Sequence, residues 1–201
     1  MIAAGLEPRE LRGGGFTAEE FKEAGLRADD LKAAGCPLKE LKEGGYTALE
    51  LKEGGFTLHE IKGVGYSCSE LQVAGFSAAE LSNMGFSGAK LKDAGFTARE
   101  LKNAGLKPAL VFSLLELKGQ LTVLELYHEE GFFLADLREG GYKVQELIAG
   151  GVKASASELF EAGYSTKDLR TGGYEPSDTE AHTHITHRAC SLYAHVFSAP
   201  G

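Results

Sequence analysis

The sequence contains one group of side chains with an evident chemistry, three histidines near its C-terminus. His182, His184 and His187 stand at spacings from which imidazoles can bind zinc or copper, and a His-x-His pair opens some metal hydrolase sites. Those enzymes hold the pair on a barrel strand beside carboxylate ligands, and no such context surrounds it here. We expect residues 174–201 to form a disordered tail whose histidines bind metal only adventitiously, so that the protein has no resident metal.

No other residues form a catalytic set. The sequence has no GxSxG, GxxxxGK(S/T) or HExxH motif. Cys36, Cys68 and Cys190 form no CxxC pair, and the first two occupy repeat positions that are otherwise apolar, so we interpret them as small hydrophobic residues. The sequence predicts a protein that is not an enzyme and needs no cofactor.

Charge and hydropathy limit the classes of partner. The formal net charge is −8, whereas a phosphate backbone requires clustered Lys and Arg, so we expect no nucleic acid. No apolar run approaches the roughly 18–20 residues of a membrane span. Residues 1–20 lack the basic and apolar segments of an export signal, and we therefore expect no membrane partner and a cytoplasmic location.

Glycine recurs every ten residues from Gly15 to Gly105, which is the mark of a repeat array. We number each unit from the residue after this glycine. In FTAEEFKEAG (residues 16–25), position one is a large apolar residue and position six is again apolar; the consensus is (F/Y)(T/S)AxELKxAG. Positions three, six and nine lie three apart and would share one face of a helix, small at its edges and large in the middle.

Each unit also carries the signals that start and stop a helix. Thr17 is an N-cap with Glu20 three residues later, the capping-box pattern, and Phe16 can pack on Phe21 as a hydrophobic staple. Gly25 can then end the helix in the left-handed conformation. Such helices, roughly seven residues long, are unstable alone, so neighbouring units must stabilise them. The sequence predicts an all-α solenoid of very short capped helices.

The pattern GF(T/S)xxELKxAG, continuous over residues 6–105 and present in much of 121–173, resembles that of short decapeptide-repeat proteins. The resemblance implies a repeat scaffold and no particular activity. A looser likeness links the chain to pentapeptide-repeat proteins, because large apolar residues fall every five positions, and it implies a β-solenoid instead. That alternative would bury charged residues such as Arg9, Glu19 and Lys39, so we favour the helical solenoid.

The repeats divide the chain into four parts. Residues 1–105 form a regular decapeptide array, 106–120 an apolar and irregular junction, 121–173 a second and less regular array, and 174–201 the tail. Within the junction we expect a helix from Pro108 to Lys118 that ends at Gly119. Its apolar character makes 106–120 a candidate for self-association.

Charged residues become sparse between Tyr66 and Lys90. The exposed positions there hold small, polar or apolar residues: Ser69, Gln72, Val73, Ala79, Ser82, Asn83, Met84 and Ala89. A loss of charge beside a flexible methionine is typical of a contact surface, although tolerated sequence drift explains it too. We expect a non-enzymatic scaffold that binds a protein or peptide. The alternatives are a self-associating structural protein and, if the fold is a β-solenoid, an acidic mimic of nucleic acid.

Overall fold

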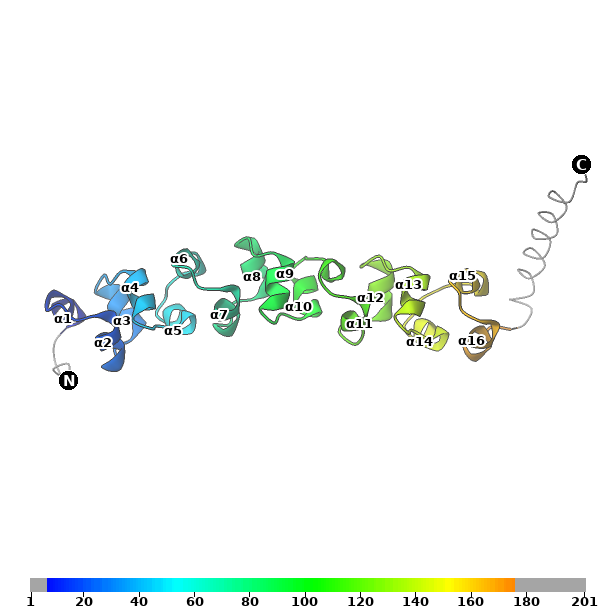
Figure 1. Cartoon of the computed structure of the whole chain (residues 1–201), viewed down its shortest axis with the longest axis horizontal. Helices are drawn as coiled ribbons and strands as arrows, with labels where there is room; N and C mark the ends of the chain where they lie inside the picture. Colours follow the sequence, from blue (N-terminus) through cyan, green and yellow to red (C-terminus); the bar gives the residue numbers. More distant parts are fainter. Residues whose placement is uncertain (1–6, 176–201) are drawn as a thin grey trace, which may run out of the picture. The chain divides into compact units, whose positions relative to one another are not determined.

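The computed structural model describes residues 7–175, which form short helices joined by tight turns (Figure 1). This range contains sixteen α-helices and one 3₁₀ helix, η1. The predicted all-α fold is confirmed. The β-solenoid alternative is wrong for these residues, whose one isolated β-bridge joins Lys118 and Leu121. The helices are α1 (Pro8–Gly13), α2 (Ala18–Glu23), α3 (Ala28–Ala33), α4 (Leu38–Glu43), α5 (Ala48–Glu53), α6 (Leu58–Gly63), α7 (Cys68–Val73), α8 (Ala78–Asn83), α9 (Gly88–Asp93), α10 (Ala98–Asn103), η1 (Pro108–Leu110), α11 (Leu114–Leu117), α12 (Val123–His128), α13 (Leu134–Glu139), α14 (Val144–Ala149), α15 (Ala156–Glu161) and α16 (Thr166–Thr171).

Most helices begin and end as the repeat predicts, although the N-caps Arg27 of α3 and Pro37 of α4 form no side-chain capping bond. In α2 the Thr17 hydroxyl accepts the backbone N–H of Glu20, and the Glu20 carboxylate accepts the backbone N–H of Thr17 at 2.7 Å. At the other end Gly25 adopts φ +79°, and the backbone N–H of Leu26 reaches back to the carbonyl of Phe21 at 2.9 Å. This is a Schellman motif, so position one of each unit also closes the preceding helix.

The helices stack on the second helix along the chain. Within residues 7–111, α1 contacts α3, α3 contacts α5, α5 contacts α7 and α7 contacts α9, and α2·α4 and α8·α10 pack in the same way. One turn of the solenoid therefore contains two repeats, or twenty residues. The odd-numbered helices α1–α9 form one row, which we call the odd row, and the even-numbered helices α2–α10 form the even row.

The core follows from positions three, six and nine. The position-six side chains, such as Leu41 and Leu51, are fully buried, and position three is buried at Ala48. Position nine is small because the backbones approach closely. A Cβ added at Gly54 would lie only 2.6 Å from the Cβ of Ala28, two units earlier. The small–large–small face predicted from the repeat therefore packs the turns together.

Lysine at position seven ties each of the helices α2–α6 to the next helix in its row. The amine of Lys52 donates to the carbonyls of Ala74 and Gly75, at 3.1 and 2.8 Å, and lies 4.2 Å from the ring centroid of Phe76. We call this set the lysine ladder: Lys22, Lys32, Lys42, Lys52 and Lys62. Because the carbonyl end of a helix carries partial negative charge, each lysine stabilises the C-terminus of the helix it reaches.

Over the described residues the chain divides into two compact units, the first ending at Val111 and the second beginning at Phe112. The helix expected over Pro108–Lys118 is wrong, since η1 ends at Leu110 and α11 begins separately at Leu114. Ser113 is the reason. It caps α11 in a capping box with Glu116, so the decapeptide pattern restarts at the end of the junction and a continuous helix cannot run through it.

The second unit repeats the same architecture over its described part. Here α12 contacts α14, α14 contacts α16, and α13 contacts α15. The position-six side chains Leu117, Leu137 and Leu169 are fully buried. The unit of α15 contains an insertion: Val152 is buried at position one, and Lys153 and Ala154 lie between it and the N-cap Ser155.

Candidate binding surface

Grooves form on the solenoid surface where position four of one helix faces position eight of the next helix in its row. Between α3 and α5 these positions are Asp29 and Glu53, and between α5 and α7 they are Leu49 and Val73. Both grooves lie in the odd row and are related by one turn of twenty residues. A comparison between them therefore isolates the effect of the side chains, since the local backbone is the same.

We call the groove between α5 and α7 the apolar groove. It encloses about 530 Å³ and is lined by Lys42, Gly45, Tyr46, Thr47, Leu49, Tyr66, Ser69, Glu70, Val73 and Ala74. The side chains of Leu49 and Val73 are 42% and 75% exposed. The charged groups at its rim are already engaged, since Glu70 belongs to a capping box and Lys42 to the lysine ladder. What remains free for a ligand is mainly apolar surface.

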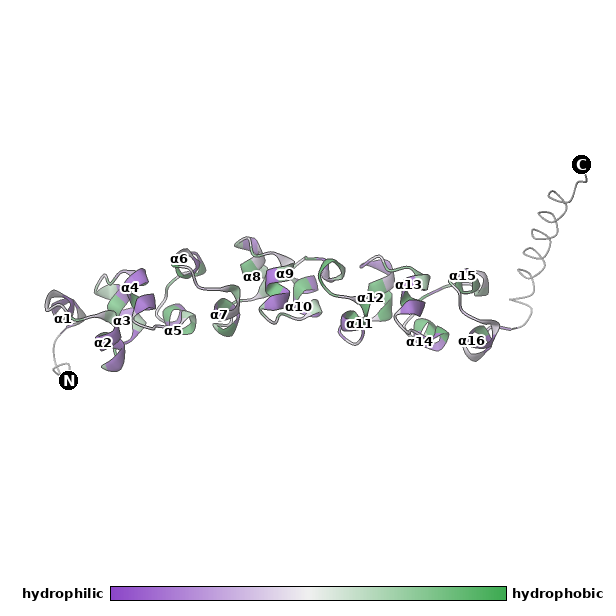
Figure 2. Ribbon diagram, viewed as in Figure 1, coloured by the Kyte–Doolittle hydropathy of each residue, from purple (hydrophilic) through white to green (hydrophobic). Residues whose placement is uncertain are grey.

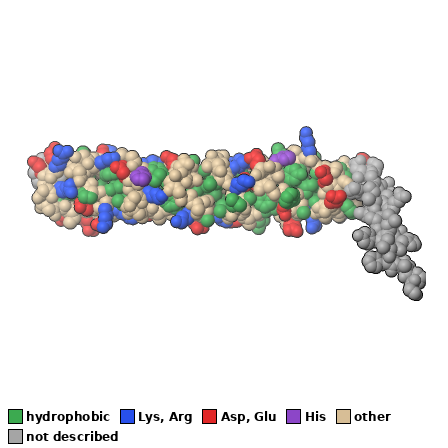
Figure 3. Space-filling model, turned by 90° about the horizontal axis from the view of Figure 1, so that it is seen from above, with side chains coloured by type: hydrophobic (Ala, Val, Ile, Leu, Met, Phe, Trp, Pro, Cys, Tyr) green, Lys and Arg blue, Asp and Glu red, His purple; other side chains and the backbone are tan. Residues whose placement is uncertain are grey.

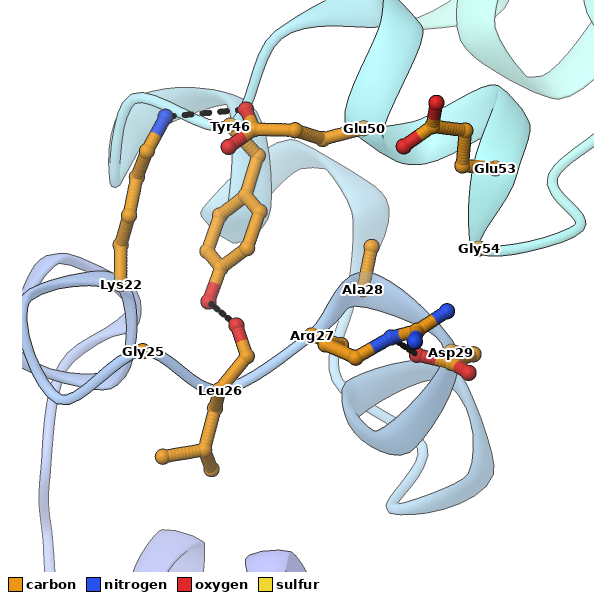
Figure 4. Close-up of a pocket in the computed structure, with 10 residues that line it drawn as sticks. All are labelled: Lys22, Gly25, Leu26, Arg27, Ala28, Asp29, Tyr46, Glu50, Glu53 and Gly54. Carbon is orange, nitrogen blue, oxygen red and sulfur yellow. Dashed lines mark hydrogen bonds and ion pairs between the residues drawn. The ribbon is translucent and has the colours of Figure 1, made fainter.

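We call the groove between α3 and α5 the charged depression (Figure 4). It encloses about 340 Å³. One ion pair crosses it, Lys22 with Glu50 at 3.0 Å, and a second is local to the start of α3, Arg27 with Asp29 at 3.1 Å. The carboxylate of Glu53 also projects into it from the end of α5, and within the described residues it has no ion pair or hydrogen bond.

Tyrosine hydroxyls join the turns beneath both grooves. The Tyr46 hydroxyl donates to the carbonyl of Leu26 at 2.9 Å, and the Tyr66 hydroxyl donates to the carbonyl of Tyr46. Burial, with neighbouring carboxylates, raises the pKa of Tyr46 and of Tyr66 to about 12. These hydroxyls therefore stay protonated and hold the floor of the grooves in place.

Two capping glutamates and two cysteines have pKa values shifted by their structural contacts. Hydrogen bonds from Ser67 and Ser77 hold the pKa of Glu70 and Glu80 below the usual range, the reverse of what a general acid needs. Cys36 is buried and Cys68 half-buried, and burial raises the pKa of both thiols. Neither thiol has the lowered pKa that activates a nucleophilic cysteine.

A comparison with known protein families identifies the repeat. The model of the decapeptide repeat region family matches residues 1–48 and 45–111, more than half of the chain. The chain belongs to the decapeptide repeat region family. The predicted resemblance to decapeptide-repeat proteins is confirmed, and no curated protein and no solved structure matches the chain.

In this decapeptide repeat protein, the predicted contact residues are divided between the two rows. Ser69, Gln72 and Val73 lie on α7 and Ala89 on α9, in the odd row. The others belong to the even row: Ala79, Ser82 and Asn83 on α8 and Met84 at its C-cap. Only Ser69 and Val73 line the apolar groove.

Sequence inspection missed Leu49, although the signal was present. Position four of the decapeptide is charged in neighbouring units, as at Glu19, Asp29 and Lys39, and Leu49 breaks that rule inside an otherwise regular unit. The residue was overlooked because Lys52 and Glu53 keep its unit charged. The fall in charge toward the middle of the array is visible in Figure 2, where α7 carries less purple than α2.

The last features to compare with the structure are the predicted metal ligands and membrane spans. His182, His184 and His187 lie outside the described residues. Across residues 7–175, no cluster of three or more His, Cys, Asp or Glu side chains could hold a metal ion. In that same range, no helix is long and apolar enough to cross a membrane.

Proposed function

We propose that this decapeptide repeat protein is a non-enzymatic scaffold that binds a segment of another protein, or a peptide, in the apolar groove between α5 and α7. One observation carries the proposal. Leu49 and Val73 are 42% and 75% exposed at the two positions that hold carboxylates, Asp29 and Glu53, one turn earlier. A solvated repeat surface has no need of two facing apolar side chains there.

The energetics favour a modest but specific interaction. Complete burial of a Leu or Val side chain contributes about 1.5–3 kcal/mol, and Leu49 and Val73 are already partly buried, so together they supply less than twice that amount. The groove is held open by stacked backbone, by the Tyr66 hydroxyl and by the Lys42 amine. A preformed groove avoids the cost of ordering its walls on binding.

The experiment is a synthetic array of 12-residue peptides probed with the labelled full chain. We expect that Leu49→Glu/Val73→Glu abolishes binding to the peptides that the wild type selects. The matched control is Lys39→Glu/Gly63→Glu, which places glutamates at positions four and eight of α4 and α6 in the even row. This control should bind as the wild type does. Unchanged peptide binding by the first variant, with a wild-type circular dichroism spectrum, would refute the proposal.

The proposal extends to partner class and location. The lysine ladder directs its amines to backbone carbonyls, and on the face seen in Figure 3 charges of both signs are interspersed without a basic patch, so nucleic acid is not proposed. The helical fold also removes the premise on which nucleic-acid mimicry rested. The unpaired thiols of Cys36 and Cys68 favour a reducing compartment, and we propose a cytoplasmic location on that basis.

A second candidate function is self-association through residues 106–120. Leu110, in the first unit, is 79% exposed, and Leu115, in the second unit, is 76% exposed. Light scattering across protein concentration separates this candidate from peptide binding. Assemblies that grow with concentration and disappear in Leu110→Lys/Leu115→Lys support self-association, whereas a monomer at all concentrations contradicts it.

A further inference from the structure

We propose that the ligand of the apolar groove is an extended segment in which an apolar residue is flanked on both sides by Lys or Arg, three residues away. The apolar side chain lies against Leu49 and Val73. One basic side chain enters the charged depression beside Glu53, and the other meets Asp93 on α9. This inference rests on the proposed function and specifies the chemistry of the partner.

The two grooves are adjacent because both border α5. Leu49 lines the apolar groove and Glu53 lines the charged depression, and the two residues are four apart on one helix. Residues at this spacing share a helix face. A ligand that covers Leu49 therefore passes directly over Glu53 if it continues along the odd row toward α3.

The charges along the row favour a basic ligand. In the charged depression, the pairs Lys22–Glu50 and Arg27–Asp29 are internally neutral, which leaves the carboxylate of Glu53 as the net charge (Figure 4). Position eight of the odd row holds Glu53 on α5, Val73 on α7 and Asp93 on α9. The apolar position is thus flanked by a carboxylate on each side.

The lysines that border the groove already have partners: Lys42 donates to the carbonyls of Val64 and Gly65, and Lys52 donates to those of Ala74 and Gly75. From residue 64 to residue 89 the sequence contains no Lys or Arg, and its two charged residues are Glu70 and Glu80. Both carboxylates are engaged in capping boxes. A basic side chain that crosses α7 therefore meets no cation of this stretch, and the electrostatic complementarity sets the register of the ligand.

The spacing follows from general dimensions. Packed helices lie roughly 8–10 Å apart, and an extended chain advances about 3.3 Å per residue, so one step along the row takes about three residues. The predicted pattern is basic–x–x–apolar–x–x–basic. An extended segment in either direction satisfies it, because the charges on the row are the same at both ends.

The test uses four peptides and the full-length ¹⁵N-labelled chain, with dissociation constants taken from amide shift titrations. The peptides are acetylated and amidated KSSLSSK; a variant with norleucine at both lysines; KSSASSK; and KKSSSSL, which has the composition of the first but not its spacing. We expect KSSLSSK to bind with shifts at Leu49, Val73 and Glu53. Replacing both lysines by norleucine should weaken binding about tenfold, and replacing one charge partner about threefold, the size of an exposed ion pair.

The decisive comparison is between the effect of Glu53→Gln on the binding of KSSLSSK and its effect on the binding of the norleucine peptide. Glu53→Gln should weaken KSSLSSK about threefold and leave the norleucine peptide unchanged. The matched control is Glu23→Gln, at position eight of α2 in the even row, which should affect neither peptide. The inference is overturned if Glu53→Gln affects both peptides equally or neither, or if KKSSSSL binds as tightly as KSSLSSK.

The outcomes distinguish this inference from the proposed function. If the norleucine peptide binds as tightly as KSSLSSK and still shifts Leu49 and Val73, the groove is a binding site and the basic flanks are wrong. If KSSLSSK and KSSASSK bind equally without shifts at Leu49 and Val73, the apolar groove is not the site, and both proposals fail.

Discussion

Replacing Lys52 by methionine removes one contact of the lysine ladder while keeping the length and packing of the side chain. The lost interactions are the amine hydrogen bonds to the carbonyls of Ala74 and Gly75 and the contact with the ring of Phe76, at 4.2 Å from its centroid. A hydrogen bond from a charged group contributes about 1.5–3 kcal/mol and an exposed cation–π contact about 0.5–1 kcal/mol. Because one half-buried amine is shared between the two carbonyls, we count a single hydrogen bond at the lower end and the lower cation–π value, and expect a loss of about 2 kcal/mol.

Thermal unfolding followed by circular dichroism measures this loss. For a chain of this size, 1 kcal/mol shifts the midpoint by roughly 2–4 °C, so Lys52→Met should unfold about 4–8 °C lower. The control is Lys39→Met, which removes the same charge from a side chain that is 79% exposed and pairs only with Glu43 at 3.8 Å. That pair should contribute no more than about 0.5 kcal/mol. Equal midpoints for the two variants would refute the stabilising role of the ladder.

Three further predictions test the repeat itself. Gln72 stands at the ladder position of α7, and Gln72→Lys should supply the missing cap of α9 and raise the urea midpoint by the equivalent of about 1–2 kcal/mol, with a smaller effect from Gly63→Lys. Hydrogen bonds from the N-cap lower the pKa of Glu70 below its unfolded value. The ionised Glu70 therefore contributes to the stability of the fold above about pH 4.3, and this contribution is lost as pH falls through the folded pKa. Glu70→Gln should flatten the loss of stability that urea titrations measure below that pH. Gly85 adopts φ +86° and Gly63 lies in a helix with open space around its Cβ position. Gly85→Val should lower the thermal midpoint, whereas Gly63→Ala should raise it slightly, and unchanged unfolding of Gly85→Val would contradict the left-handed cap.

The helices and their boundaries were predictable because their signals are local. Thr17, Glu20 and Gly25 define the start and end of α2 within one decapeptide, and the same residue types recur in step. Agreement among caps, apolar face and terminating glycine specifies a single local structure. The expected helix over Pro108–Lys118 is wrong because a local signal decides there too. The cap at Ser113 starts a new helix inside the apolar run on which the prediction relied.

The stacking of the turns was not predictable from the repeat. The repeat pattern is compatible with stacking of each unit on the next unit or on the one after it. The structure shows the second arrangement, in which Gly54 lies against Ala28. The lysine ladder depends on that stacking, since Lys52 reaches carbonyls 22 and 23 residues later. The apolar groove depends on it as well, which is why Leu49 and Val73, 24 residues apart, showed no relation in the sequence.

The solenoid with two repeats per turn is the basis of the groove, the ladder and the proposed ligand. Nuclear Overhauser effects in the labelled full chain test it most directly, because the close approach of position three to position nine brings a methyl group against a glycine. We predict a strong effect between the Ala28 methyl protons and the α protons of Gly54, and an equivalent one between Ala18 and Gly44. An effect from Ala28 to Gly44 in place of Gly54 would mean that consecutive helices stack, and it would contradict this account.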